Sequence, residues 1–365
     1  MTRVVIAPDS FKGTASAADA AAALAAGWRS VRPSDELVLR PMADGGEGTL
    51  DAFESAVPEA RRMPITVRGP VSTPVATHWL LLPDGTGVVE LASTSGITLL
   101  DPLEPLEAHT AGFGEAIAAA LDHGVERLLL ALGGSASSDG GVGALAALGG
   151  RFLDAARRPV RLGNRGLGTL ARVDLTGLRP LPPGGAVILG DVTNPLLGEL
   201  GAGAVFGPQK GADAATVEVL ESNLARLARL VPAKVRPLAA QPGAGAAGGA
   251  GFGLLAWGAE MGGGAALVAR AVGLDDAIAG ADLVITGEGR FDGQSEAGKA
   301  PTVVAAIAGD AGVPTALVAG AITAEPRGFA ASVALADLAG GGAPAMAAPL
   351  HWLEAAGAEL ARTLA

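Results

Sequence analysis

The sequence predicts an α/β protein in which a doubly wound domain, built from both chain ends, carries a mixed α/β domain inserted into it. Short apolar runs alternate with Ala-rich helical stretches near both termini, a pattern typical of parallel strands joined by helices. The alternation of short apolar runs with helical stretches breaks off near Arg62 and returns near Asp275. A chain of 365 residues is long enough for two domains of roughly 150 residues each. We therefore expect one domain from residues 1–61 plus 275–365 and an inserted domain from 62–274.

The N-terminal elements follow from apolar runs and turn signals. Strand-length apolar runs alternate here with Ala-rich stretches of helical length. This pattern predicts strands at Arg3–Pro8 and Glu36–Met42 and helices at Ala15–Ser30 and Gly46–Ala56. Gly-Pro and Asp-Gly turns then separate three short runs, which is typical of an antiparallel meander. Its strands are Pro64–Arg68, Val75–Leu82 and Gly87–Leu91.

Strand and helix patterns alternate again through the rest of the chain. Helices are expected at Ala111–His123, Gly143–Leu148, Thr216–Leu230 and Pro349–Leu364. Buried strands are expected at Arg127–Leu132, Val187–Leu189, Asp282–Ile285, Thr315–Val318 and Ser332–Leu335. No internal repeat of fixed period interrupts this order.

Composition excludes several classes of protein. The absence of Cys excludes disulfide scaffolds, thiolate metal sites and cysteine catalysis. A net charge of −11 argues against nucleic-acid binding, which requires the opposite sign. The N-terminus leads directly into a strand, and the longest uncharged stretch, 237–259, is rich in Gly and contains Pro237 and Pro242, so we expect no targeting or membrane segment. The sequence thus predicts a cytoplasmic globular protein.

Polar residues are concentrated in segments that mostly follow predicted strands. Gly at a strand's carboxyl end lets backbone N–H groups approach an anion, and carboxylates beside a phosphate require a divalent cation between them. Gly, Lys and Asp mixed in one set of loops is what Mg²⁺-assisted phosphoryl transfer needs. The segments are Asp9–Gly13, Ala43–Thr49, Gly133–Gly141, Gly190–Pro195, Phe206–Gly211 and Thr286–Ser295.

The lysines support this interpretation. Of the four in the chain, Lys12, Lys210 and Lys299 lie in such segments and only Lys234 does not. Each segment also has a plainer explanation: Asp-Gly-Gly is a turn signal, and Ser10, Asp44 or Asp139 after a strand can be a helix N-cap. The repetition of the pattern along one chain favours anion binding.

Two nucleotide-binding patterns in the sequence are weak. Gly243–Gly248 fits G-x-G-x-x-G but follows Gln241-Pro242 rather than a strand. Gly293–Lys299 fits the start of a P-loop but lacks the final Ser or Thr and contains Glu296. The histidines have no metal-ligand spacing, and no nucleophile elbow is present, so we assign no catalytic histidine.

At the polar segments the chain resembles bacterial class I glycerate kinases. The matching stretches occur in the family's order and extend over the whole chain. They are Ala7–Gly13, Pro41–Thr49, Asp191–Leu196, Phe206–Gly211 and Ile285–Arg290. The chain departs from the family pattern at Ser137-Ser138, where Thr-Asn or Thr-Thr is usual, and at Asp292-Gly293-Gln294, where Asp-Ser-Gln is usual.

The resemblance implies ATP-dependent phosphorylation of D-glycerate with Mg²⁺, giving 2-phosphoglycerate and ADP in glycolate, glyoxylate or sugar-acid degradation. It also implies a Rossmann-like or flavodoxin-like domain with a second domain inserted, and an active site in the cleft between them. Class I members lack a P-loop, which agrees with the weakness of the Gly293–Lys299 match. The expected partner is the small-molecule substrate, with no nucleic acid and no membrane; a homo-oligomer is compatible with the sequence.

Roles for individual residues follow from their chemistry and strand-end positions. For the nucleotide phosphates we expect cations and a Gly-rich backbone, namely Lys12, Lys210 and Lys299 with Ser10, Gly133, Gly134 and Ser135. Mg²⁺ would take carboxylates, for which Asp191 and Asp292, and after them Glu288, are the candidates. Asp44 is expected to orient or deprotonate the attacking hydroxyl, with catalytic contributions from Lys12 and Asp191. Arg290 can bind the glycerate carboxylate bidentately.

Other readings stay open at this point. The C2 and C3 hydroxyls of glycerate are one bond apart, so a glycerate 3-kinase is an alternative. A non-catalytic sensor of a nucleotide or sugar acid would bind without turnover. A Mg²⁺-dependent hydrolase or isomerase of phosphorylated acids would use similar loops and would not need ATP.

Overall fold

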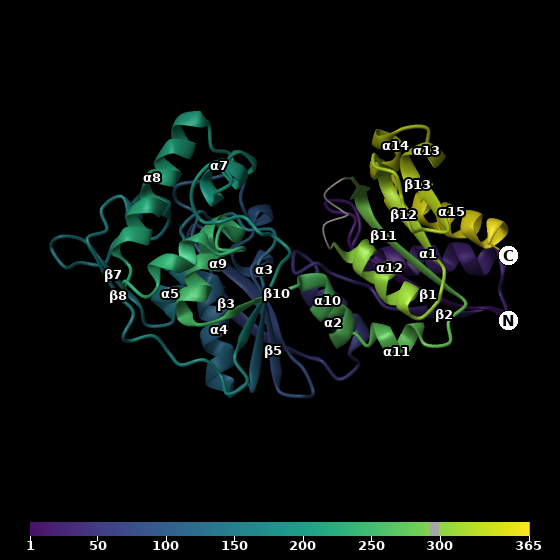
Figure 1. The fold of residues 1–365 in the computed structure, drawn as a ribbon, viewed down its shortest axis with the longest axis horizontal. Coiled ribbons are helices and arrows are strands. Elements are labelled where there is room, and N and C mark those ends of the chain that lie inside the picture. The colour runs from purple at the N-terminus through teal and green to yellow at the C-terminus, as the bar shows by residue number, and fades with distance from the viewer. Residues whose placement is uncertain (293–298, 365) are drawn as a thin grey trace. The chain divides into compact units, whose positions relative to one another are not determined.

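The computed structural model describes residues 1–292 and 299–364, and the contacts among them divide the chain into two compact units. Unit 1 consists of Met1–Asp44, Asp51–Pro58 and Gly263–Ala365. Unit 2 consists of Gly45–Leu50 and Glu59–Gly262. Each unit contains a sheet with parallel strands and covering helices (Figure 1). The α/β fold class predicted from the sequence is confirmed; the predicted domain bounds stay a prediction.

Unit 1 is built on a parallel sheet with the strand order β13-β12-β11-β1-β2. Every neighbouring pair is parallel, so the carboxyl ends of the strands lie along one edge. The neighbouring strands β1 and β11 in the interior of the sheet come from opposite ends of the chain. The strands are β1 (Arg3–Pro8), β2 (Glu36–Leu39), β11 (Leu283–Phe291), β12 (Thr315–Ile322) and β13 (Ala331–Ala334).

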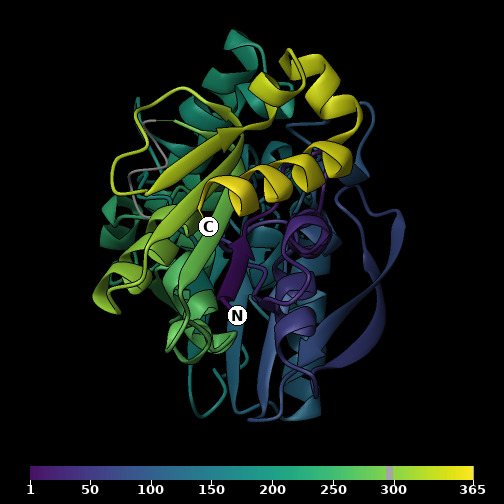
Figure 2. The same ribbon diagram turned by 90° about the vertical axis from the view of Figure 1, so that its right-hand side faces the viewer.

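Helices cover both faces of this sheet. Val4, Ile6 and Ile285 share one face because side chains alternate along a strand, and they pack in one core with α1 and α15. Helix α12 contacts β1, β11 and β12 across the sheet from that pair (Figure 2). The helices of this part are α1 (Ala17–Val31), α10 (Gly264–Ala271), α11 (Leu274–Ile278), α12 (Ala300–Asp310), α13 (Leu335–Leu338), α14 (Gly342–Ala347) and α15 (Pro349–Thr363).

Helices α1 and α15 approach each other so closely that glycine is required at the contact. A Cβ added at Gly27 would lie 1.9 Å from the carbonyl oxygen of Glu354, and one at Gly357 would lie 2.2 Å from that of Leu24. These distances are far below van der Waals contact. The first and last helices of the chain are therefore held together backbone to backbone, which anchors both termini to one sheet.

Strand β11 is longer than the sequence predicted. The expected strand ended at Ile285, but the structure continues it through Thr286-Gly287-Glu288-Gly289-Arg290 to Phe291. A Cβ at Gly287 would lie 2.1 Å from the oxygen of Val318, so glycine lets this polar segment pair tightly with β12. Glycine has low strand propensity, which hid the continuation from the sequence pattern.

Unit 2 contains a mixed sheet with the order β10-β9-β6-β5-β4-β3. The antiparallel pairs β3–β4 and β4–β5 confirm the predicted meander. The pairs from β5 through β6 and β9 to β10 are parallel. The strands are β3 (Arg61–Arg68), β4 (Pro74–Leu81), β5 (Thr86–Glu90), β6 (Arg127–Ala131), β9 (Ala186–Leu189) and β10 (Glu260–Gly262).

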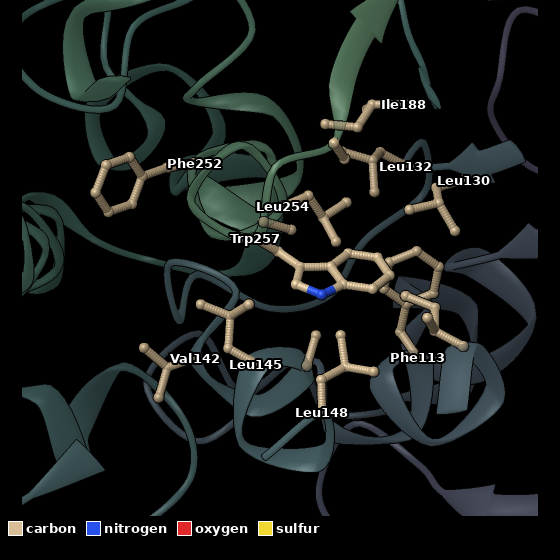
Figure 3. Packing of buried hydrophobic residues seen from close by; sticks show 14 of the residues in the cluster. Phe113, Leu130, Leu132, Val142, Leu145, Leu148, Ile188, Phe252, Leu254 and Trp257 are labelled. Atoms are coloured by element: carbon tan, nitrogen blue, oxygen red, sulfur yellow. The ribbon is translucent and has the colours of Figure 1, made fainter. Parts of the chain in front are cut away.

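The core of unit 2 lies between this sheet and its helices. Trp257 packs with Leu145, Leu148 and Leu254 (Figure 3), and its indole N–H donates to the carbonyl of Arg179. A short antiparallel pair, β7 (Arg151–Leu153) and β8 (Arg172–Asp174), was not predicted. The helices are α3 (Ala92–Ser95), α4 (Ala111–His123), α5 (Val142–Ala147), α6 (Asn164–Leu167), α7 (Ala202–Phe206), α8 (Ala214–Leu230) and α9 (Ala246–Trp257), with 3₁₀ turns at Ile97–Leu99, Pro208–Lys210 and Arg236–Ala240.

The remaining helix, α2 (Thr49–Ala56), begins in unit 2 and ends in unit 1. Across the described residues, no helix combines the length and the apolar character that a membrane crossing would need.

We predict that Gly27→Ala destabilises the protein, because its methyl group must push α1 away from the backbone of α15. Overpacking of this kind costs about 1–3 kcal/mol, so the urea midpoint should fall. Gly309→Ala is the matched control: Gly309 is also helical, but a Cβ there meets nothing within 4 Å, so the midpoint should stay or rise. Equal effects of both substitutions would contradict the close helix contact.

Candidate active site

A pocket of about 390 Å³ lies within unit 1, at the edge where β1 and β11 end. The loop after β1 and the second half of β11 supply much of its lining, because the two strands are neighbours in the sheet. It brings together the predicted site residues Ser10, Lys12, Asp44, Glu288, Arg290, Asp292 and Lys299. Helices α13, α14 and α15 supply an apolar part of the wall.

Asp9 is the most deeply buried carboxyl group of the pocket. It follows β1 directly, and its backbone N–H donates to the carbonyl of Gly287 on β11 at 2.8 Å. Only 6% of the residue is exposed. Burial raises the pKa of Asp9 to about 8, and the negative charge of Asp44 adds to the rise. Near neutral pH this side chain is therefore mostly the neutral acid.

Lys12 and Asp44 form an ion pair in the same pocket. The Lys12 ammonium donates to Asp44 Oδ2 at 3.4 Å, and the lysine side chain is 67% exposed. The charge of Asp44 raises the pKa of Lys12, so the amine stays protonated.

Two further ion pairs come from the end of β11 and the segment after it. Arg290 Nε lies 3.7 Å from Asp292 Oδ2, with the arginine side chain 67% exposed. Lys299 Nζ lies 4.0 Å from Glu288 Oε2, and Glu288 is buried. Lys299 is the residue before α12. Cations and carboxylates thus alternate around the pocket, so it can receive an anion without a large net charge of either sign.

The other predicted site residues belong to unit 2. All of them lie on loops after parallel strands except Lys210, which ends the 3₁₀ turn Pro208–Lys210. Gly133, Gly134 and Ser135 follow β6, and Asp191 follows β9 and is partly buried. Gly134 has φ +74°, a left-handed conformation that favours glycine.

Lys210 is buried against the loop that follows β6. Its ammonium donates to Ser135 Oγ at 2.8 Å and to the carbonyl of Ser137, and 2% of the residue is exposed. Burial lowers the pKa of Lys210 to about 7, opposed by the nearby charge of Asp139. The lysine therefore holds this loop in shape and can give up its proton near neutral pH.

Asp139 fixes the other end of the same loop. Its carboxylate accepts hydrogen bonds from the backbone N–H groups of Thr110, Gly141 and Gly143 and from the Thr110 hydroxyl. The side chain is fully buried and the N-cap of α5 is Gly141, so Asp139 is not the N-cap itself but fixes the turn that leads into this helix.

The first of the two weak nucleotide-binding patterns serves backbone packing. In the Gly243–Gly248 match, a Cβ at Gly248 would lie 2.0 Å from the carbonyl of Ser137, so its glycine permits close packing on the loop after β6. Residues 293–298 of the P-loop-like match lie outside the described residues, and Lys299 pairs with Glu288.

Sequence reasoning missed two features of the pocket. Asp9 was within a polar segment that follows a strand, so its position was a signal, but its burial depends on β11. The apolar wall comes from Leu335, Ala345, Met346 and Pro349, which carry no chemical signal in the sequence. Their place beside the pocket results from the packing of the C-terminal helices on β12 and β13.

The residues of the pocket fit Mg²⁺ by their chemistry. Within residues 1–292 and 299–364, no group of three or more His, Cys, Asp or Glu side chains could hold a metal ion by itself. Mg²⁺ is usually held by one or two carboxylates together with substrate phosphates and water. Asp292 and Glu288 in this pocket satisfy that requirement only when a phosphate is present.

Comparison with known proteins assigns the chain to a family. A family model described as "Glycerate kinase family" matches residues 4–365. The glycerate kinase of Bacillus subtilis is 42% identical over 88% of this chain and 86% of its own length. The glycerate 2-kinase of Escherichia coli is 40% identical over the same shares.

The fold comparison agrees with the sequence comparison. A crystal structure from Salmonella typhimurium LT2, whose assignment as a glycerate kinase 2 is provisional, is similar with a TM-score of 0.84 and 38% identity. The match covers 100% of this chain and 98% of that one. With a family model over nearly the whole length and relatives at about 40% identity, this chain belongs to the glycerate kinase family.

Proposed function

We propose that this protein transfers the γ-phosphoryl group of ATP to the C2 hydroxyl of D-glycerate, giving 2-phosphoglycerate and ADP. Family membership supports the kinase reaction, and the relative named glycerate 2-kinase supports the C2 position. The observation that carries the proposal is the Lys12–Asp44 ion pair, which places a carboxylate and an exposed cation in one pocket. Phosphoryl transfer needs both a group that orients the hydroxyl and cations that neutralise charge.

In the proposed reaction the hydroxyl oxygen forms a bond to the γ-phosphorus while the bond from that phosphorus to the bridging oxygen breaks. The bridging oxygen leaves with ADP. Asp44 orients the hydroxyl and accepts its proton, and Lys12 neutralises charge on the transferred group. Arg290 is exposed enough to reach a ligand, and its guanidinium suits the glycerate carboxylate.

Other residues hold the nucleotide phosphates in this proposal. In unit 1 these are Lys299 and Ser10, both of which line the pocket. In unit 2 they are the backbone of Gly133 and Gly134 and the hydroxyl of Ser135. Lys210 contributes through the loop, because its hydrogen bond fixes Ser135 and its burial keeps it from solvent.

Asp292 and Glu288 in unit 1, and Asp191 in unit 2, are the proposed Mg²⁺ ligands. Bound Mg²⁺ supplies positive charge between the phosphate oxygens and these carboxylates. Without that charge, the carboxylates of the pocket would repel the nucleotide.

The reaction is tested by a phosphorus NMR time course with the purified protein, ATP, Mg²⁺ and D-glycerate. We expect a 2-phosphoglycerate signal that grows together with ADP. A 3-phosphoglycerate signal would keep the kinase and overturn the C2 position. If ATP stays intact with D-glycerate and related hydroxy acids, a binding protein without turnover replaces the kinase.

Asp44→Asn should lower kcat about 10²–10⁴-fold, the usual contribution of general acid–base catalysis, because the amide cannot accept the hydroxyl proton. The measurement is a coupled ADP-release assay with saturating substrates. Asp51→Asn is the control, since Asp51 is exposed and does not line the pocket. A kcat for Asp44→Asn within about threefold of the wild type would remove Asp44 from the proton-transfer role.

Lys210 should give the wild type a pH-dependent stability. Its pKa in the folded protein is about 7, below the ordinary lysine value of 10.5, so the unfolded chain binds more protons between these values. Stability therefore rises with pH in this window, by about 1.4 kcal/mol per unit at most. Lys210→Met should lose the rise.

The measurement is the urea midpoint at pH 8.5 and pH 10, a range above the pKa of Asp9, whose titration has the opposite effect on stability. Lys234→Met is the matched control, because Lys234 is an exposed lysine of the same unit and should retain the wild-type rise. A rise of the same size in Lys210→Met would show that Lys210 is charged at both pH values.

A further inference from the structure

The pocket of unit 1 is larger than the substrate of the proposed reaction. A volume of about 390 Å³ falls in the range of roughly 300–1,000 Å³ that is usual for drug-sized ligands. A three-carbon hydroxy acid fills only a small part of it. The proposed reaction has one other substrate, ATP, which is of a size to use such a volume.

The lining of the pocket is divided by chemistry. The loop after β1, Asp44 and the end of β11 supply its charged groups. Another part of the lining is an apolar wall, which consists of Ala321 on β12, Leu335 on α13, Ala345 and Met346 on α14 and Pro349 on α15. None of these side chains can donate or accept a hydrogen bond, apart from the weakly accepting thioether of Met346.

The apolar wall includes both firmly packed and exposed side chains. Leu335 and Ala345 are 2% and 5% exposed, so they are fixed by the surrounding helices, whereas Met346 is 66% exposed. A large apolar side chain at the rim of a pocket gains free energy when a ligand removes it from water. Methionine in particular adapts its shape to flat, polarizable groups.

D-glycerate has no apolar surface that could pack on this wall, because a carboxylate and two hydroxyls cover its carbon chain. A polar acid placed there would lose its hydration without gaining hydrogen bonds. A nucleotide is divided in the same way as the pocket lining, with a flat, weakly polar base at one end and charged phosphates at the other. The cations Lys12, Arg290 and Lys299 belong to the charged part of the same pocket.

We propose that the apolar wall of unit 1 is the adenosine subsite, in which the base packs on Leu335, Met346 and Pro349 while the phosphates extend toward Lys12 and Lys299. This inference rests on the proposed function, since it takes ATP as the phosphoryl donor. It assigns the nucleotide base to the C-terminal helices α13 to α15. Every residue that it uses belongs to unit 1.

Two substitutions test the subsite without disturbing the core. Met346→Asp places a charge where the base should pack, and the exposure of Met346 makes misfolding improbable as a cause. Gly342→Trp fills part of the pocket, because Gly342 lines it and a Cβ there meets nothing within 4 Å. The matched controls are Leu350→Asp and Ala343→Trp, since both residues are exposed and do not line the pocket; Ala343 lies on α14, and Leu350 lies on α15 next to Pro349.

The KM for ATP should rise about tenfold or more in Met346→Asp and Gly342→Trp, the size of effect that a few lost apolar contacts produce. The KM for D-glycerate should stay within about twofold, and so should inhibition by inorganic triphosphate, which has no base. Both controls should retain the wild-type KM for ATP. A shift in the KM for D-glycerate alone would make the wall part of the acid site, and no shift in either KM would remove it from ligand binding.

Calorimetric titration with ATP and with adenosine separates this proposal from the proposed function. If the wild type binds ATP but does not phosphorylate D-glycerate, the proposed function fails, and weaker ATP binding by Met346→Asp still supports the subsite. If the wild type phosphorylates D-glycerate and both pocket variants bind ATP as the wild type does, the subsite fails and the function stands.

Discussion

The parallel pairing of β1 with β11 joins segments that are 279 residues apart, and the pocket depends on it. The register runs from Val4 opposite Leu283 to Pro8 opposite Gly287. Because Asp9 is the next residue along β1, its place beside the end of β11 is set by this register. A slip of one residue would turn the alternating side chains to the other face of the sheet and would break the hydrogen bond that holds Asp9 beside Gly287.

Close backbone packing, rather than side-chain chemistry alone, brings the polar loops into place. In unit 1, glycine at 287 lets β11 lie against β12. In unit 2, Gly248 lets its own segment pack against the backbone of Ser137 in the loop after β6. The buried Lys210 donates a hydrogen bond to the carbonyl of Ser137 and so stabilises the same loop. Gly287 and Gly248 thus serve the close approach of one backbone to another, a purpose that only the structure reveals.

The sequence predicted the strands and the polar loops well, because apolar runs and turn residues are local signals. Lys12, Asp44, Glu288 and Arg290 were found by their place after strands, and they line one pocket. The full length of β11 was missed because its second half is polar and glycine-rich. The burial of Asp9 and of Lys210, and the apolar wall, could not be predicted, since each depends on segments far away in the sequence.

The order of the segments along the chain also determines when each unit can be completed during synthesis. Unit 2 ends at Gly262, so the ribosome finishes it before β11 emerges. Strand β1 is synthesised first, and the edge that pairs with β11 has no partner until β11 emerges. This strand contains the apolar residues Val4, Val5 and Ile6. At about 5–20 residues per second, this wait lasts on the order of ten seconds to a minute. Throughout that interval an apolar strand edge is open to mispairing, and a chaperone that covers the nascent N-terminus would shield it.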